Sequence, residues 1–183
     1  MTTIREATLD DARGIAEVHV AGWRWAYEDL LPGEYLEQLS VDDRERHWRE
    51  TLSGSTGRVI VAEDVGEIVG FVGFGAAAEA DAEIGEVHAI YLLDRVAGNG
   101  VGRELFLRAN EELRRSGFRR AVLWVLETNE RARRFYERAG WHWDGTRSSH
   151  RFDCIEQPVV RYVADLSTIA PPRTARADVS SQG

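Results

Sequence analysis

The sequence predicts a single α/β domain built around a mixed β-sheet. Three observations point to it: a length of 183 residues, an alternation of strand-like and helix-like apolar patterns, and a glycine-rich loop between a strand and a helix. A chain of this length fits one domain with a substantial core. We expect the domain to span residues 1–166. Residues 167–183 carry two prolines and almost no large apolar residue, which predicts a disordered tail.

The first half of the chain predicts helices followed by a β-hairpin. The elements expected there are a strand at 4–7, a helix from about 9, helices at 34–39 and 41–52, and strands at 59–63 and 68–74. Asp10 or Asp11 caps the first helix, and Ile15 and Val18 begin its apolar series. The segment 64–66, Asp-Val-Gly, is a plausible hairpin turn.

The second half alternates strands and helices. The expected elements are a strand at 85–93, a helix at 101–116, a strand at 120–126, a helix at 129–139, and strands at 141–146 and 159–165. Leu105, Ala109 and Leu113 give the first of these helices a buried stripe, and Gly117 ends it. This order of elements is typical of a mixed α/β sheet domain.

Composition excludes several classes of function. The net charge of −8 argues against general affinity for DNA or RNA and is compatible with a cationic or amine substrate. The longest apolar run, 121–126, is too short to span a bilayer, and the N-terminus lacks the apolar stretch of a secretory signal. The single cysteine, Cys154, excludes an internal disulfide and fits a cytoplasmic protein. Five scattered histidines show no metal-ligand spacing, so no metal is expected.

The most informative loop runs from Ala97 to Gly102, between a predicted strand and a predicted helix. Its three glycines let successive backbone amides point at one spot, and the helix N-terminus adds partial positive charge. The loop therefore predicts a pyrophosphate site, although a tight strand-to-helix turn would have the same composition. A Walker loop is excluded because Arg103-Glu104 stands where Lys-Ser/Thr is required, and the glycine spacing differs from the dinucleotide fingerprint.

A second motif covers residues 129–141 and predicts a short amphipathic helix. Its apolar face consists of Ala132, Phe135, Tyr136 and Ala139. Core packing explains this face, but the hydroxyl of Tyr136 needs a partner if it is buried, and we place it near the start of the helix, toward the ligand-binding edge of the sheet. Asn129 is interpreted as a helix cap, as a ligand contact, or as both.

Together the two motifs resemble the GNAT superfamily of N-acetyltransferases. In that family a strand leads to an Arg/Gln-x-x-Gly-x-Gly/Ala loop that holds the coenzyme A pyrophosphate. A later Asn-x-x-Ala-x-x-Phe-Tyr-x-x-x-Gly-Phe helix packs on the pantetheine arm and supplies a tyrosine. Both motifs occur here in the same order, and the resemblance covers residues 4–165. It implies a mixed, mostly antiparallel sheet flanked by helices, and transfer of an acetyl group from acetyl-coenzyme A to a primary amine.

One position departs from the family pattern, because Ala97 stands where the loop usually opens with Arg or Gln. The backbone amides from Gly98 to Arg103 can still hold the phosphates. The coenzyme-binding residues that the resemblance implies are Ile90, Tyr91, Leu92, Ala97, Gly98, Asn99, Gly100, Val101, Gly102, Arg103, Asn129 and Tyr136.

The resemblance also implies how the reaction runs. The strands at 85–93 and 120–126 splay apart, and the pantetheine arm pairs with the backbone of Ile90 and Leu92 like an added strand. Direct attack in a ternary complex needs a base, a donor for the oxyanion and an acid. Tyr136 is the candidate acid, and a backbone N–H near Leu92 is the candidate oxyanion donor. Glu86 is the preferred base, acting through water.

The base has an alternative in His88, an imidazole suited to proton transfer. By the period of two, Glu86, His88, Ile90 and Leu92 should share one face of their strand. A solvated surface role would explain Glu86 or His88 equally well.

The acceptor stays open at this stage. Trp23, Trp25, Tyr27 and Tyr35 lie in the helical pair that covers the acceptor site in the family, and they line a pocket or belong to the core. Small amines, amino acids, antibiotics and protein N-termini are all compatible, as is a homodimer through the C-terminal strands or exposed aromatic residues. Two other functions are weighed: a non-catalytic coenzyme A-binding sensor, or degenerate member, which Ala97 favours, and a structural domain whose glycine loop is only a turn.

Overall fold

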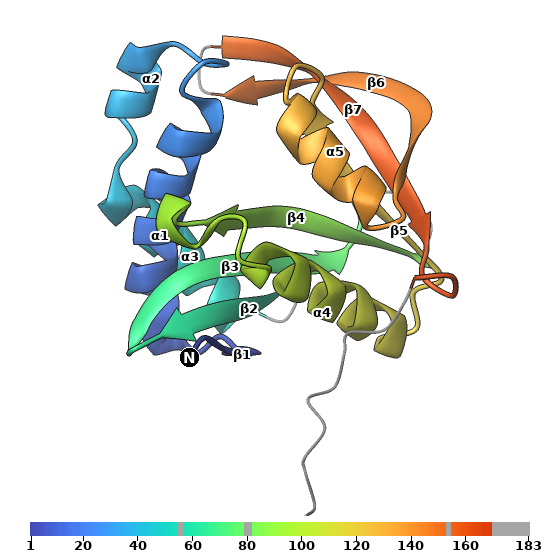
Figure 1. Cartoon of the computed structure of the whole chain (residues 1–183), viewed down its shortest axis with the longest axis horizontal. Coiled ribbons are helices and arrows are strands. Elements are labelled where there is room, and N and C mark those ends of the chain that lie inside the picture. Colours follow the sequence, from blue (N-terminus) through green and yellow to red (C-terminus); the bar gives the residue numbers. More distant parts are fainter. Residues whose placement is uncertain (55–56, 79–81, 153–154, 170–183) are drawn as a thin grey trace, which may run out of the picture.

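A seven-stranded sheet runs through the described part of the protein (Figure 1). The structure is a computed structural model, and it describes residues 1–54, 57–78, 82–152 and 155–169. The strands are β1 (Thr3–Glu6), β2 (Gly57–Asp64), β3 (Glu67–Ala76), β4 (Ile84–Leu92), β5 (Arg120–Leu126), β6 (His142–Phe152) and β7 (Ile155–Asp165). Their spatial order is β1-β2-β3-β4-β5-β7-β6, and only the β4–β5 pair is parallel. The predicted mixed, mostly antiparallel sheet is confirmed.

Helices cover both faces of this sheet. They are α1 (Ala12–Tyr27), α2 (Gly33–Glu37), α3 (Val41–Ser53), α4 (Val101–Arg115) and α5 (Glu130–Arg138), with short 3-10 turns η1 (Leu9–Asp11) and η2 (Asp94–Val96). One core cluster packs α4 and α5 against the sheet around Phe106, Trp141 and Tyr162. A second cluster packs α1 and α3 against the opposite face around Ile15 and Phe71. None of the helices in the described ranges is long and apolar enough to cross a membrane.

The last hairpin is longer than the sequence predicted. Strands β6 and β7 have 11 residues each, whereas the apolar pattern indicated only 141–146 and 159–165. The missed part of β6 contains exposed polar residues from Ser148 to Arg151, which show no apolar alternation. Backbone pairing with β7 holds them instead, after a register shift around Gly145, whose φ is 90°. Cys154 lies outside the described residues.

The C-terminal boundary of the packed chain is close to the predicted one. Leu166 is buried in the core, and its N–H donates to the carbonyl of Arg119. Ile169 still packs against the main core cluster, three residues beyond the expected domain end. The rest of the predicted tail, residues 170–183, lies outside the described residues.

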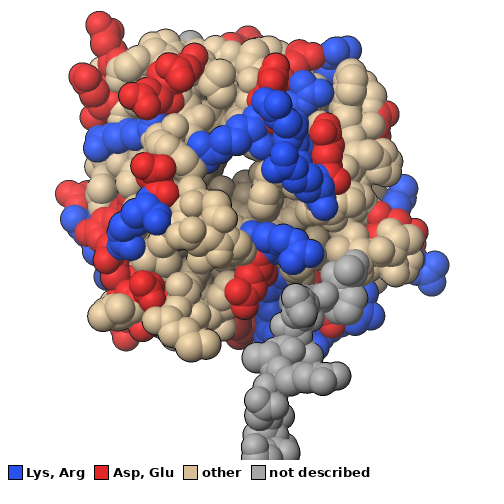
Figure 2. All heavy atoms as spheres, in the orientation of Figure 1, with Lys and Arg blue, Asp and Glu red and all other residues tan. Residues whose placement is uncertain are grey.

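The basic residues of the chain are all arginines, 23 in number, so the blue side chains of Figure 2 are arginines. Many of them pair with a nearby carboxylate, as Arg134 does with Glu130 and Arg95 with Glu67. In Figure 2 blue groups also gather around an opening at the centre of the face shown. Exposed ion pairs contribute little to stability. The arginines that lack a carboxylate partner are therefore the better candidates for binding a ligand.

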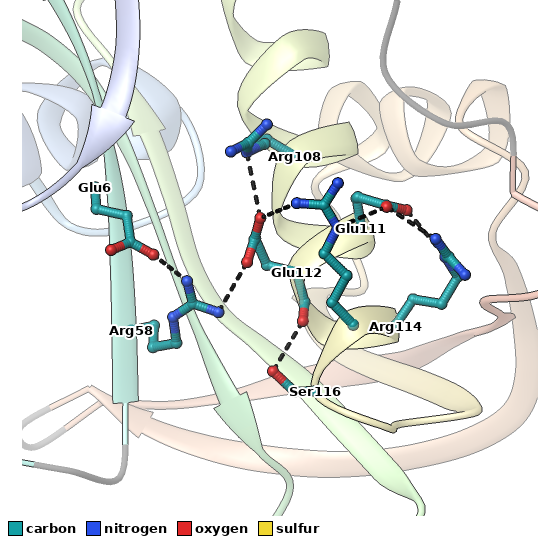
Figure 3. A network of polar contacts seen from close by, with 8 residues as sticks. Glu6, Arg58, Arg108, Glu111, Glu112, Arg114 and Ser116 are labelled. Atoms are coloured by element: carbon teal, nitrogen blue, oxygen red, sulfur yellow. Dashed lines mark hydrogen bonds and ion pairs between the residues drawn. The ribbon is translucent and has the colours of Figure 1, made fainter. Parts of the chain in front are cut away.

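A polar network holds α4 in place over the sheet (Figure 3). Arg58 of β2 donates to Glu112 of α4 at 3.0 Å and also contacts Glu6 of β1. Arg108 and Arg115, on the same helix, contact the other oxygen of the Glu112 carboxylate. Because Glu112 is largely buried, these contacts replace the water that its charge would otherwise bind. The network therefore ties the C-terminal half of α4 to β1 and β2.

The start of α1 is held by a second ion pair. Arg5 of β1 donates to both oxygens of Asp11, at 2.7 and 2.8 Å, and the Thr8 backbone N–H donates to the same carboxylate at 2.7 Å. The Arg5 contacts lower the pKa of Asp11 to about 2. Since the folded value lies below the unfolded one, this pair stabilises the fold above about pH 4, and the contribution is lost as the pH falls toward 2.

We therefore predict that Asp11→Asn lowers the free energy of unfolding by about 2 kcal/mol at pH 7, from the size of the pKa shift. Urea unfolding followed by tryptophan fluorescence measures it, and the gap to wild type should narrow between pH 4 and pH 2.5. The neighbouring exposed Asp10→Asn is the control and should change stability by less than about 0.5 kcal/mol. A gap that stays constant with pH would contradict this assignment.

Candidate active site

Strands β4 and β5 separate after a short stretch of pairing. Their register consists of Ile84↔Arg120, Gly85↔Ala121 and Glu86↔Val122. Immediately afterwards β4 has a β-bulge, because its register with β3 passes from Val87 to Ala89 and leaves His88 without a partner. Bulges bend a strand and increase its twist, so the bulge accounts for the divergence of β4 from β5.

The divergence leaves part of the β4 backbone without a strand to pair with. The N–H of Leu93 donates to Val69 of β3 at 2.9 Å. Backbone groups alternate between the two edges of a strand, so those of Leu92 and Ile90 point toward β5. In the described residues no register pair joins either residue to β5. This edge can therefore accept an extended ligand that carries amide groups.

The bulge also corrects the predicted arrangement of side chains on β4. Val87, Ile90 and Leu92 pack in the cluster under α4, whereas Ala89 and Tyr91 pack in the cluster under α1. Glu86 and His88 lie opposite Val87, with Glu86 Oε1 3.6 Å from His88 Nδ1. The expectation that they share a face with Ile90 and Leu92 is wrong, because the extra residue shifts the period of two by one.

The glycine loop leads from η2 into α4. Gly98 and Gly100 have φ angles of 81° and 87°, and a Cβ built at either would have no heavy atom within 4 Å. The first-turn amides of α4, including that of Arg103, have no acceptor within the helix. Gly102 differs, since its Cβ would lie 2.8 Å from Leu92 Cδ1. It permits close packing of α4 on β4, while the other two glycines leave open space for an anion.

These elements surround a cleft of about 1220 Å³ between the splayed strands. The predicted residues that line it are Glu86, His88, Ile90, Tyr91, Leu92, Ala97, Gly98, Gly100, Gly102, Arg103, Asn129 and Tyr136. Asn99 and Val101 are not among the lining residues, and the Val101 side chain is buried in the main core. Trp23, Trp25 and Tyr27 line the cleft, whereas Tyr35 packs against Trp23 instead.

Helix α5 contributes Asn129 and Tyr136 to one wall. Asn129 Oδ1 accepts from the Ala132 N–H at 3.0 Å, so Asn129 is a helix cap that also lines the cleft, and its amide NH₂ group remains to donate. Tyr136 lies in the second half of α5, not near its start as predicted. Its ring packs against Phe106, and burial raises its pKa above the ordinary value.

A tyrosine pair on the opposite wall has no signal in the sequence. The hydroxyls of Tyr27 on α1 and Tyr91 on β4 are 3.0 Å apart, and burial raises the pKa of both. The Tyr91 ring stacks on His19, whose Nδ1 accepts from Trp48 Nε1 at 3.1 Å. Burial lowers the pKa of His19 to about 3, so this imidazole is neutral and unsuited to act as a base.

Two arginines that line the cleft, Arg131 and Arg138, were also missed, whereas Arg103 was among the predicted coenzyme-binding residues. Arg103, Arg131 and Arg138 face the cleft together with the carboxylates of Asp94 and Glu86. Within the described ranges none of the three arginines has a hydrogen bond or an ion pair. The blue groups around the central opening in Figure 2 agree with this concentration of charge. In a chain with a net charge of −8, it indicates a site for an anionic ligand.

A glycine loop at a helix N-terminus, beside an unpaired strand edge in a mixed sheet, can hold a phosphate group together with an extended arm that carries amides. The Acetyltransferase (GNAT) family matches residues 20–141. The chain is 40% identical over 131 residues to YuaI, an uncharacterized N-acetyltransferase of Bacillus subtilis, covering 70% of this chain and 74% of that protein. The chain therefore belongs to the GNAT family, and it is an acetyltransferase.

Solved structures share the fold. PaiA N-acetyltransferase from Thermoplasma acidophilum, in complex with coenzyme A, has a TM-score of 0.69 at 20% identity, over 88% of this chain and 98% of that one. YncA from Salmonella typhimurium, with its cofactor acetyl-CoA, has a TM-score of 0.69 at 21% identity, over 96% and 99%. In the described residues no group of three or more metal-ligating side chains is close enough to hold a metal ion.

The open cradle at Gly100 generates a prediction. Gly100→Val should weaken binding of coenzyme A at least about tenfold, because the side chain enters the space left for an anion and strains a positive φ. Isothermal titration measures the affinity. Gly66→Val is a matched control, since Gly66 has a φ of 80°, no neighbour within 4 Å of a Cβ, and a position in the β2–β3 turn. Equal affinity of both variants for coenzyme A would show that its phosphates do not bind at this loop.

Proposed function

We propose that this protein transfers the acetyl group of acetyl-coenzyme A to a primary amine by direct attack in a ternary complex. The observation that carries the proposal is the unpaired edge of β4 beside the glycine loop. An extended arm with amide groups fits this edge, and an anion fits the open loop at the N-terminus of α4. Coenzyme A combines both features, and structures of similar fold contain it.

The chemistry needs one activated group, the thioester that acetyl-coenzyme A supplies. The amine nitrogen forms a bond to the acetyl carbon, and the carbon–sulfur bond breaks. The nitrogen loses a proton to a base, and the departing thiolate takes a proton from an acid. A free backbone N–H on the β4 edge, around Leu92, would stabilise the negative charge that develops on the acetyl oxygen.

Tyr136 is the proposed acid. It lines the cleft from α5, and burial raises its pKa, so the phenol is fully protonated at neutral pH. Transfer of its proton to a nascent thiolate leaves a phenolate with a strong tendency to recover a proton from solvent. The ring is held by Phe106 and Phe135, which fixes the direction of the hydroxyl.

Glu86 is the proposed base, acting through a water molecule. It lines the cleft at the last β4–β5 pair, on the face of α1 rather than α4. His88, 3.6 Å away, is half-exposed beside it and is the second candidate. Both groups are far enough along β4 from the glycine loop to leave room for the pantetheine arm between loop and base.

The proposed acceptor is a cationic amine, either a small molecule or the amine of a peptide. Its side of the cleft has the aromatic side chains of Trp23 and Tyr27 and the carboxylate of Glu86. Aromatic faces and a carboxylate attract an ammonium group. The negative net charge of the chain favours approach of a cation as well.

The decisive experiment is a thiol-release screen with acetyl-coenzyme A and a panel of polyamines, amino acids, aminoglycosides and peptides with free N-termini. The chain contains no lysine, so acetylation of its own side chains gives no background. Release that depends on one class of amine supports the proposal. Binding of coenzyme A without release for any amine would instead identify a coenzyme-binding module.

We predict that Tyr136→Phe lowers kcat about 100-fold, the usual contribution of one positioned acid, with little change in the Kd for coenzyme A. The phenyl ring keeps the packing, and only the proton donor is lost. Steady-state thiol release and isothermal titration give the two quantities.

Tyr162→Phe is the matched control for Tyr136→Phe. The Tyr162 hydroxyl donates to Glu137 at 2.6 Å, and the residue is not part of the cleft lining. Its loss should reduce stability and leave kcat within about twofold. If Tyr136→Phe turns over like wild type while chemistry limits the rate, the proton comes from water and Tyr136 is a packing residue.

A further inference from the structure

Arg131 differs from the other two cleft arginines in how it is held. Its Cζ lies 3.5 Å from the centre of the Trp25 ring, closer than in any other arginine–aromatic contact of the described residues. At that distance the planar guanidinium lies flat on the indole. The guanidinium N–H groups then point outward in the plane of the guanidinium, parallel to the indole ring. No acceptor among the described residues forms a hydrogen bond with them.

The stack joins the two walls of the cleft. Trp25 belongs to α1, which lies directly on β4, since a Cβ on Gly22 would come 2.9 Å from Tyr91 Cβ. Arg131 belongs to the first turn of α5, which follows β5. The strands are joined at one end by the pairs from Ile84 to Glu86. The Arg131–Trp25 stack is a second connection between the two walls, made by side chains that both line the cleft.

The charges around Arg131 connect it to the glycine loop. Burial lowers the pKa of Arg131, and the nearby carboxylate of Asp94 opposes that effect. Asp94 begins η2, the turn that ends in Ala97 at the loop opening. The Arg131 guanidinium is therefore close enough to interact electrostatically with a ligand at the opening of the glycine loop, where Ala97 supplies no positive charge. Arg103 lines the loop side, Arg138 lines the α5 wall, and Glu86 lies at the paired end of the strands.

We propose that Arg131, oriented by Trp25, is a coenzyme-binding residue that contacts phosphate oxygens of coenzyme A from the wall opposite the glycine loop. It supplies the cation that Ala97 does not. The proposal rests on the proposed use of coenzyme A. A guanidinium presented edge-on can bind two phosphate oxygens at once, which a lysine or a backbone amide cannot. The same contact holds the coenzyme under the stack, where the arm passes between β4 and β5.

The test is isothermal titration of Arg131→Gln and wild type with coenzyme A. Loss of one charge-assisted contact should raise Kd about tenfold or more. A parallel titration with 3′-dephospho-coenzyme A locates the contact. The same loss with this ligand assigns it to the diphosphate, and equal affinities of the two proteins assign it to the 3′-phosphate.

Arg134→Gln is the matched control, because Arg134 is on the same helix, is exposed and pairs with Glu130. It should change Kd by less than about twofold. Trp25→Leu removes the stack and should raise Kd about threefold to tenfold. Circular dichroism and melting temperature verify that each variant is folded.

Two outcomes overturn the inference. One is a wild-type Kd in Arg131→Gln, including the case in which only the KM of the amine rises, which would make Arg131 an acceptor contact. The other is an equal loss in Arg134→Gln, which would indicate a diffuse effect of charge. Failure of the wild type itself to bind coenzyme A would instead contradict the proposed function, so the two failures are distinguishable.

Discussion

The bulge at His88 is the constraint on which the rest of the site depends. It follows the last register pair between β4 and β5 and bends β4 away from its parallel neighbour. Without it, pairing would continue along the sheet, and the backbone groups of Ile90 and Leu92 would be consumed by β5. The same extra residue moves Glu86 and His88 to the face opposite Val87, whereas Ile90 and Leu92 stay under α4. One irregular residue thus separates the arm-binding edge from the proposed base.

The surrounding structure keeps this gap open and charged. Glu112 and its arginines hold the C-terminal half of α4 on the sheet, and at the other end Gly102 packs closely on Leu92, which places the glycine loop at the end of β4. On the other wall Asn129 caps α5 and thereby positions the first turn that carries Arg131. Many arginines of the described residues pair with a neighbouring carboxylate, but the three in the cleft form no ion pair. All three are exposed, and an anionic ligand in the cleft would supply the partner that they lack.

Much of the fold was predictable because its signals are local. The glycine loop at Gly100 and the cap at Asn129 mark real helix starts, and apolar strands were placed within a few residues. The glycine loop and Tyr136 could be found from motifs for the same reason. The bulge could not be predicted, since residues 89–93 are all apolar and a one-residue shift of the alternation does not show among them. The Tyr27–Tyr91 pair and the Arg131–Trp25 stack join residues distant in sequence, so only the packed structure shows them. The polar part of β6 lacked the periodicity that marks a strand.

Amide hydrogen exchange, resolved by NMR, tests most directly whether the arm of the coenzyme pairs with β4. Saturating coenzyme A should slow exchange at Ile90 and Leu92 by at least about tenfold, because these amides gain acceptors. The amide of Leu93, already bonded to Val69, should change little. Protection confined to the loop from Gly98 to Arg103, with unchanged exchange at Ile90 and Leu92, would contradict the account and place the arm elsewhere.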